Sequence, residues 1–231
     1  MKITIVIIFL LFFTGLSFAQ GTVDYQTQQT YDLFKRREFL SKTGNNLDLS
    51  QIEGSPYLND EFENGTIYTT EKQQYVDVPL RYNIYNEQLE FKSPQGIIQA
   101  LATPEILELA KFGDTQIAYQ PYISGNKTKN GFFIVLSTGK ASLYSKPEIA
   151  FKEATEPAAY KEAEPPKFLR KSDEYYLRFD STPAKRIGNK KDLIAAFPDK
   201  QSEIKSYISK NKIKAGKAES LKKLVEYYNS L

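Results

Sequence analysis

The densest group of side chains able to do chemistry is the run Asn59-Asp60-Glu61, followed by Glu63. Hard cations such as Ca²⁺ bind through carboxylate and amide oxygens, so this run is a candidate calcium loop. Its spacing does not follow the ligand pattern of an EF-hand loop, and Gly65 opens a strand-like run directly after it. We therefore interpret the run as a solvated loop that leads into a strand, and we expect no metal site.

Two further chemistries need only residue types that the chain has. A pair of carboxylates can hydrolyse a glycosidic bond, but no Asp or Glu pair is set apart by its sequence context. The run Gly188-Asn189-Lys190-Lys191 offers a phosphate contact at a helix N-terminus, yet it lacks the Gly-rich spacing of a Walker A loop. Asn189 is better interpreted as the N-cap of the helix that follows.

The composition excludes most other catalytic sites. The 231 residues include no His, no Cys and no Trp. Disulfides, thiolate nucleophiles, Ser-His-Asp triads and zinc sites built from Cys or His are therefore excluded. We expect no cofactor and no catalytic residue, and the weight of the argument shifts from catalysis towards binding.

A secretory signal peptide is predicted over residues 1–19. Lys2 supplies the positive charge, Ile3 to Phe13 form an apolar run, and Ser17-Phe18-Ala19 makes a small-x-small box before Gln20. The apolar run is shorter than the ~20 residues that a membrane-spanning helix needs. The sequence thus predicts export, cleavage between Ala19 and Gln20, and at most peripheral contact with a membrane.

Charge is divided unevenly along the chain. Residues 185–231 hold 12 Lys and Arg against 5 Asp and Glu, a net charge of +7, whereas residues 20–184 hold 18 and 23, a net charge of −5. The total of +3 is too small to indicate a nucleic-acid partner for the whole chain. We interpret the basic tail as lysines that solvate the outer face of helices. The alternatives are an acidic protein partner and, behind it, an anionic lipid surface or a nucleic acid.

Alternating apolar residues predict an antiparallel β domain over residues 54–188. Within it, Thr103-Pro104-Glu105 reads as a helix start and predicts a short helix ending at Gly113; the alternative is a strand over 97–101 with a helical connector. Residues 125–131 are expected to be a loop, and residues 153–167 an exposed excursion. Strands are expected at 65–70, 75–84, 89–91, 115–122, 132–136, 141–152 and 175–179, with 184–187 pairing to the last.

Helices are expected only at the end of the chain. Apolar residues spaced i, i+3 and i+4, among them Ile204 and Ile208, predict a basic helical cap over residues 189–231. Residues 20–53 are expected to form an N-terminal arm or a short helix. The expected fold is one α+β domain: a curved antiparallel sheet of about seven to ten strands, barrel-like or sandwich-like, with a C-terminal cap of short helices.

Four segments resemble a family of exported envelope proteins of Bacteroidota. They are Gly54–Phe62, Pro79–Phe91, Gly139–Tyr144 and Leu224–Asn229. The resemblance implies a Gram-negative envelope, with a periplasmic or outer-membrane-associated location, and brings no molecular function with it. In such bacteria Asp180-Ser181-Thr182 is similar to a three-residue O-glycosylation sequon, so Ser181 is a candidate acceptor. The alternative is a plain turn before Pro183.

Three functions follow from these observations. The leading hypothesis is a non-enzymatic envelope protein that binds another protein, in an outer-membrane assembly. The alternative is a binding module for a small apolar or glycan ligand, held by aromatic residues in a curved sheet. The third is a carboxylate-dependent hydrolase. A flat exposed apolar patch would favour the first hypothesis, a deep aromatic-lined pocket the second, and two acids facing across a cleft the third.

Overall fold

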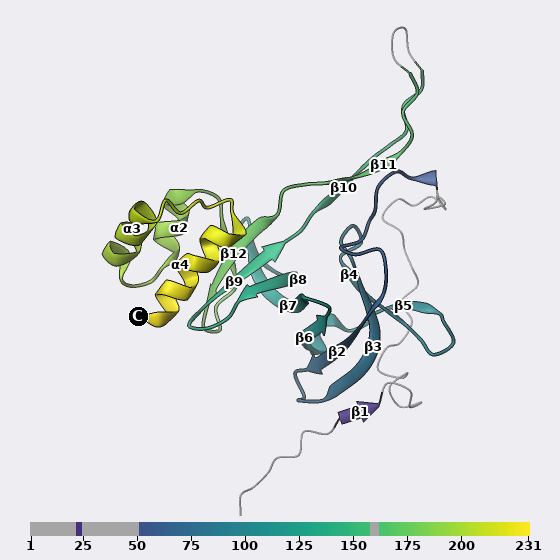
Figure 1. Ribbon diagram of the computed structural model, residues 1–231, viewed down its shortest axis with the longest axis horizontal. Helices are drawn as coiled ribbons and strands as arrows, with labels where there is room; N and C mark the ends of the chain where they lie inside the picture. Colours follow the sequence, from purple (N-terminus) through teal and green to yellow (C-terminus); the bar gives the residue numbers. More distant parts are fainter. Residues whose placement is uncertain (1–21, 25–50, 158–161) are drawn as a thin grey trace, which may run out of the picture.

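The structure, a computed structural model, describes residues 22–24, 51–157 and 162–231 (Figure 1). The predicted signal peptide and its cleavage site between Ala19 and Gln20 lie outside the described residues. So does most of the expected N-terminal arm over residues 20–53. Within the described residues, no helix is both long enough and apolar enough to cross a membrane.

One curved antiparallel sheet forms the body of the molecule. Its strands are β2 (Glu63–Thr69), β3 (Gln74–Asn83), β4 (Gln88–Lys92), β5 (Ile98–Ala100), β6 (Leu107–Phe112), β7 (Thr115–Ser124), β8 (Lys127–Ser137), β9 (Ala141–Lys146), β12 (Glu174–Phe179) and β13 (Lys185–Ile187). In space they follow the order β13-β12-β9-β8-β7-β6-β2-β3-β4-β5, and each neighbouring pair is antiparallel. β1 (Thr22–Asp24) joins β3 as a parallel pair. The sheet is open, with β13 and β5 at its two ends.

Three helices follow the sheet in sequence: α2 (Lys190–Ala196), α3 (Gln201–Lys210) and α4 (Ala218–Ser230). Their apolar positions, which include Ile204, Ile208 and Leu224, are buried against one side of the sheet (Figure 1). The predicted N-cap is confirmed, because Asn189 Oδ1 accepts hydrogen bonds from the backbone N–H of Lys191 at 2.8 Å and of Asp192 at 3.0 Å. The fold class is the predicted α+β, with a curved antiparallel sheet and a C-terminal group of short helices.

The middle of β8 is buried on both faces, at Phe132 and Phe133 within the predicted apolar run. Phe132 is 3% exposed and packs into the core beneath β2, β3, β4 and β6. Phe133 is fully buried on the opposite face, in a smaller cluster with Tyr144, Tyr176 and Ala184. Burial of a Phe side chain stabilises a fold by about 1.5–3 kcal/mol. Phe132 and Phe133 therefore stabilise the packing on the two faces of β8.

The sheet curls around this smaller cluster. The backbone N–H of Ala184 donates to Pro121 O at 2.8 Å, and the N–H of Ile123 donates to Ala184 O at 2.9 Å. The segment before β13 therefore binds back onto β7, although β13 itself pairs only with β12 among the strands of the sheet. Tyr122 packs edge-on against Phe133 of the smaller cluster, with a distance of 5.4 Å between the ring centroids.

The predicted helix ending at Gly113 is wrong. Residues Pro104–Ile106 make a single 3₁₀ turn, and the chain then continues as β6 between β2 and β7. Leu107 and Ala110 are both buried in the core, and their i, i+3 spacing is that of a helix face. In β6 both side chains reach the same core because the pairing with β2 shifts register between Leu107 and Leu109. Backbone pairing with β2 and β7 makes this segment a strand in spite of its helix-like spacing. The alternative prediction, a strand (β5) followed by a helical connector, is the closer description.

The predicted loop over residues 125–131 is also wrong, except for its tip. β7 and β8 form one long hairpin that pairs as far as Ser124 and Lys127, and only Gly125 and Asn126 make the turn. The polar residues that indicated a loop lie on the exposed end of a strand, where backbone pairing outweighs side-chain propensity.

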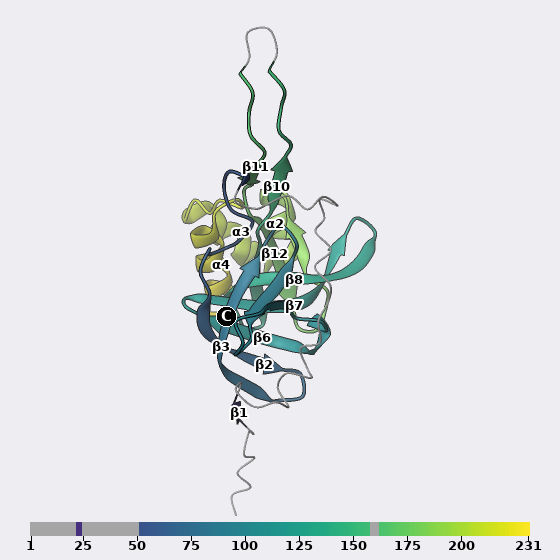
Figure 2. The ribbon, with the colours of Figure 1, turned by 90° about the vertical axis from the view of Figure 1, so that its right-hand side faces the viewer.

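The predicted excursion over residues 153–167 is an arm that projects far from the rest of the molecule (Figures 1 and 2). At its base, β10 (Ile149–Lys152) and β11 (Lys167–Arg170) form a separate antiparallel pair. Further out, Thr155 pairs with Glu164, and β12 then rejoins the sheet as expected.

Candidate functional site

The acidic run singled out in the sequence is a loop whose side chains bind one another. Asn59 Nδ2 donates to Glu63 Oε1 at 2.6 Å, and the Ser55 hydroxyl donates to the Asp60 carboxylate. Arg81 Nη1 donates to the backbone oxygen of Asp60 at 2.9 Å and fastens the loop to β3. Within residues 22–24, 51–157 and 162–231, no group of three or more acidic side chains is arranged to hold a metal ion.

The loop is held by a buried ion pair beneath it. The Arg81 guanidinium lies 3.6 Å from the ring centroid of Tyr57 and 4.3 Å from that of Phe62. Its Nη2 is 2.7 Å from Glu90 Oε2, and Asn83 Nδ2 donates to Glu90 Oε1 at 3.0 Å. Since both oxygens of the fully buried Glu90 carboxylate have donors, this network holds structure and offers no free group for chemistry.

The candidate O-glycosylation site lies in an exposed turn after β12. Ser181 is exposed between Asp180 and Thr182, and the Thr182 hydroxyl donates to Phe179 O at 2.8 Å. The expected turn before Pro183 is therefore present. Glycosylation of Ser181 stays a prediction, which its exposure permits.

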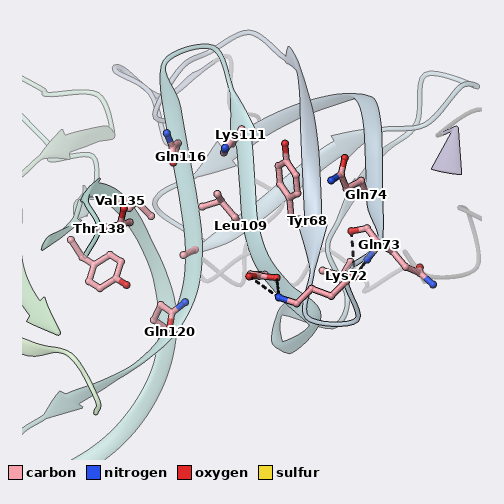
Figure 3. Close-up of a pocket in the computed structure, with 14 residues that line it drawn as sticks. Tyr68, Lys72, Gln73, Gln74, Leu109, Lys111, Gln116, Gln120, Val135 and Thr138 are labelled. Atoms are coloured by element: carbon pink, nitrogen blue, oxygen red, sulfur yellow. Dashed lines mark hydrogen bonds and ion pairs between the residues drawn. The ribbon is translucent and has the colours of Figure 1, made fainter. Parts of the chain in front are cut away.

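A groove crosses one face of the sheet and is the best-formed candidate site (Figure 3). It has a volume of about 360 Å³ and extends over β2, β3, β6, β7, β8 and β9. Most of its lining side chains are neutral and carry hydroxyl or amide groups that can form hydrogen bonds. The lining residues are Tyr68, Thr69, Lys72, Gln73, Gln74, Glu108, Leu109, Lys111, Gln116, Ala118, Gln120, Val135, Thr138 and Tyr144.

Strand register brings these side chains together. Tyr68 on β2 lies opposite Leu109 on β6, and Lys111 on β6 lies opposite Gln116 on β7. Paired residues in an antiparallel sheet point to the same face, so the lining side chains form rows across the strands. Figure 3 shows Leu109 near the middle of the groove, with Tyr68 on one side of it and Val135 on the other.

Two tyrosines line the groove, Tyr68 from β2 and Tyr144 from β9. Tyr144 is only 5% exposed, and its ring packs against Phe133 at a centroid distance of 5.7 Å. The Lys111 ammonium lies over the ring of Tyr68, 5.2 Å from the ring centroid. Each ring is therefore held in place while its hydroxyl can still bind a ligand.

Four glutamines line the groove, and the side-chain amides of three of them differ in how they are bonded. The carbonyl oxygen of Gln120 accepts from the Arg178 guanidinium, which leaves its N–H₂ group as a donor. The carbonyl oxygen of Gln73 accepts from the Tyr75 hydroxyl at 2.7 Å. The amide of Gln116 forms no hydrogen bond with any side chain or backbone group of the described residues. The groove therefore offers both donors and acceptors.

The charges in the groove are few. Lys72 Nζ lies 2.8 Å from Glu108 Oε2, and both side chains are largely exposed, so this pair neutralises itself with little effect on stability. Lys111 has no carboxylate partner in the part of the chain that the structure describes. The groove thus carries one unneutralised positive charge.

A second hollow, of about 260 Å³, lies between the β3–β4 turn and the base of the arm. Three of its lining residues are acids, and each is paired with a cation. Glu87 binds Lys146 at 3.0 Å, Glu148 binds Lys171 at 2.5 Å, and Glu174 binds Arg186 at 2.7 Å. None of these contacts joins two carboxylates.

Comparisons with known proteins return nothing similar: no protein-family model, no curated protein and no solved structure matches the chain.

Proposed function

We propose that the chain is an exported, non-enzymatic binding protein of the cell envelope, and that its ligand binds in the groove across β2, β6, β7 and β8. The observation that supports this most directly is the lining itself: amides and tyrosine hydroxyls from several strands converge on one hollow of ligand size.

The groove is well suited to binding without rearrangement. The strands beneath it are anchored on their other face by Ile67, Ala110 and Ile117, each at most 1% exposed. A rigid site loses little conformational entropy when a ligand binds, so more of the contact energy appears as affinity. The side chains held by Arg178 and by Phe133 need no further ordering.

The groove is poorly suited to hydrolysis. Its single carboxylate, Glu108, is paired with Lys72. Glycoside hydrolysis needs two carboxyl groups that flank the bond, one of which must donate a proton. The three acids of the second hollow are each paired with Lys or Arg, so they give the hydrolase hypothesis no such pair.

The surface favours a small or extended ligand over a flat apolar interface. Four large hydrophobic residues are well exposed among those described: Ile97, Ile98, Leu169 and Leu231. They lie in three separate places, at the start of β5, on the arm and at the end of the chain. Scattered exposed residues of this kind are normal on a protein surface and mark no apolar patch.

One observation favours a second candidate, the binding of an envelope protein. Ile149 on β10 and Phe168 on β11 still belong to the core, but the part of the arm beyond these two strands projects away from the rest of the molecule (Figure 2). Its exposed ion pairs, such as Lys152 with Glu164, suit a polar protein contact better than an apolar one. On this proposal the arm would attach the chain to a periplasmic or outer-membrane assembly, while the groove holds the ligand.

A thermal-shift experiment tests the groove. The exported chain, residues 20–231, is mixed with fractions of an envelope extract from the organism that encodes it, and its melting temperature is measured. A fraction with the ligand should raise the melting temperature, because a ligand that binds only the folded state stabilises it. Loss of the shift is expected in the double variant Gln116→Ala/Gln120→Ala, which removes two groove amides.

The matched control is Gln95→Ala, an exposed glutamine in the turn between β4 and β5. It should keep the full shift. An equal shift in all three proteins would show that binding lies elsewhere, and no shift with any fraction would leave the proposal without a ligand and contradict it.

A further inference from the structure

We infer that the ligand of the groove is a carbohydrate that carries a carboxylate, with the acidic group bound beside Lys111. This inference rests on the proposed function, because it names the ligand class of the same site.

The hydrogen-bonding groups of the groove match hydroxyls. A sugar hydroxyl both donates and accepts, so it can bind amide N–H₂ groups, amide oxygens and tyrosine hydroxyls at once. Gln120 presents donors, since its oxygen is held by Arg178, and Gln116 presents both a donor and an acceptor. A lipid chain would leave these groups without partners as it excluded water, at a cost in free energy for each.

The apolar part of the lining is narrow and lies between the polar groups. Leu109, Ala118 and Val135 come from three adjacent strands and form a strip bordered by Tyr68 and Tyr144. Sugar rings have faces of C–H groups that pack on aliphatic and aromatic side chains, while their edges carry hydroxyls. A strip of this kind beside amides suits such a ring better than a wholly apolar ligand.

A peptide strand cannot bind here by extending the sheet. β2 is paired with β3 and β6, β6 with β2 and β7, and β7 with β6 and β8. No free backbone edge therefore faces the groove, and the main-chain hydrogen bonds that dominate strand addition are not available. A protein ligand would depend on side-chain contacts alone.

The charge of the groove indicates that the ligand carries one acidic group. Lys72 is neutralised by Glu108, whereas Lys111 keeps its charge within reach of Gln116, the residue opposite it in the sheet. One cation suits one carboxylate, and such a charge-assisted hydrogen bond is stronger than a neutral one. A nucleic acid would need several cations along its phosphates.

The test uses affinity electrophoresis of residues 20–231 in gels that contain polygalacturonate, alginate or hyaluronate, three polysaccharides with carboxylates. At least one of them should retard the chain. Gln116→Ala/Gln120→Ala should weaken that binding by tenfold or more, roughly the effect of losing two hydrogen bonds, and Gln95→Ala should not weaken it. Lys111→Gln should lower the affinity for the acidic polymer by about tenfold.

Two controls separate the groove from simple charge, because residues 185–231 carry a net charge of +7 and can attract any polyanion. Polyglutamate has the carboxylates without the sugar, and methyl-esterified polygalacturonate has the sugar without the charge. Polyglutamate should retard the chain less than the acidic polysaccharide does, and the esterified polymer should bind wild type and Lys111→Gln equally.

The inference is overturned if none of the three polysaccharides retards the chain, if polyglutamate retards it equally, or if Lys111→Gln changes nothing. The proposed function fails separately, when no extract fraction gives a shift that depends on Gln116 and Gln120. A groove-dependent shift that proteinase K abolishes and periodate does not would keep the proposed function and reject the carbohydrate.

Discussion

The side chain of Asn229 binds the backbone of Ala141 as a neighbouring strand would. The N–H of Ala141 donates to Asn229 Oδ1 at 2.8 Å, and Asn229 Nδ2 donates to the Ala141 carbonyl at 3.0 Å. This pair joins the last turn of α4 to the start of β9. It also brings together Gly139–Tyr144 and Leu224–Asn229, two segments that are far apart in the sequence.

The first prediction concerns this contact. Asn229→Ala should lower the free energy of unfolding by about 1–3 kcal/mol, because the buried Ala141 loses both backbone partners. Urea denaturation followed by circular dichroism measures it. Ser230→Ala, which removes only a bond from Ser230 Oγ to Tyr227 O within the same exposed turn, should cost less than about 0.5 kcal/mol. Equal losses in the two variants would contradict the role given to Asn229.

Gly139, which lies against the Asn229 side chain, should not tolerate a larger residue. Gly139 has a φ of +153°, and a Cβ there would lie 2.4 Å from Asn229 Nδ2. Gly139→Ala should therefore destabilise the chain by about 1–3 kcal/mol through backbone strain alone, with the displaced Asn229 adding to it. Gly216→Ala is the control, since it has open space and no positive φ. A Gly139→Ala protein as stable as Gly216→Ala would show that α4 docks differently.

The buried ion pair Arg81–Glu90 should contribute far more to stability than the exposed pair Lys72–Glu108. Glu90→Ala leaves the Arg81 guanidinium without its charge partner beneath the loop, and should cost about 3–5 kcal/mol of unfolding free energy. Glu108→Ala breaks a pair whose side chains are 47% and 68% exposed, and should cost about 0–1 kcal/mol. Denaturation midpoints that shift alike in the two variants would contradict the burial argument.

Stability should fall in strong alkali through Tyr228. Burial, followed by its hydrogen bond to Asp199 Oδ1 at 2.7 Å, raises the pKa of Tyr228 to about 12. An unfolded tyrosine has a pKa of about 10, so the folded state holds this proton more tightly. The stabilisation is therefore complete below pH 10 and is lost as the pH rises from about 10 to about 12.

Comparison with Tyr228→Phe isolates this effect, because phenylalanine has no proton to lose. The difference in unfolding free energy between wild type and variant should shrink from pH 10 to pH 12, and Asp199→Asn should reduce that change. A difference that stays constant over this range would rule out the raised pKa.

The sequence predicts those parts of the fold whose apolar spacing has one interpretation. Ile204, Tyr207 and Ile208, spaced i, i+3 and i+4, together fit a helix face. Phe132 with Phe133 fits a strand buried on both sides. The spacing of Leu107 and Ala110 fits a helix face, whereas the structure is a strand in which a register shift against β2 brings both residues to the core. The backbone partners of β6, β2 and β7, therefore decide that element. Single-chain patterns carry no information about such partners.

The groove could not be predicted, because its residues meet only through strand register. Gln116, Ala118 and Gln120 alternate with the core residues Ile117 and Tyr119, which was the one signal available. That alternation indicates a polar outer face, and polar outer faces are common on antiparallel sheets. Which strands flank β7, and hence that Tyr68 and Tyr144 border the same hollow, depends on the full sheet order.

Hydrogen–deuterium exchange of residues 20–231, with and without a fraction that raises their melting temperature, tests the central claim most directly. A ligand in the groove should slow exchange in residues 66–74, 108–120 and 135–144, and leave the arm and the helices unchanged. The same pattern should be absent in Gln116→Ala/Gln120→Ala. Slowed exchange confined to residues 149–170 or 190–230 would contradict the account and place the binding site on the arm or the helices.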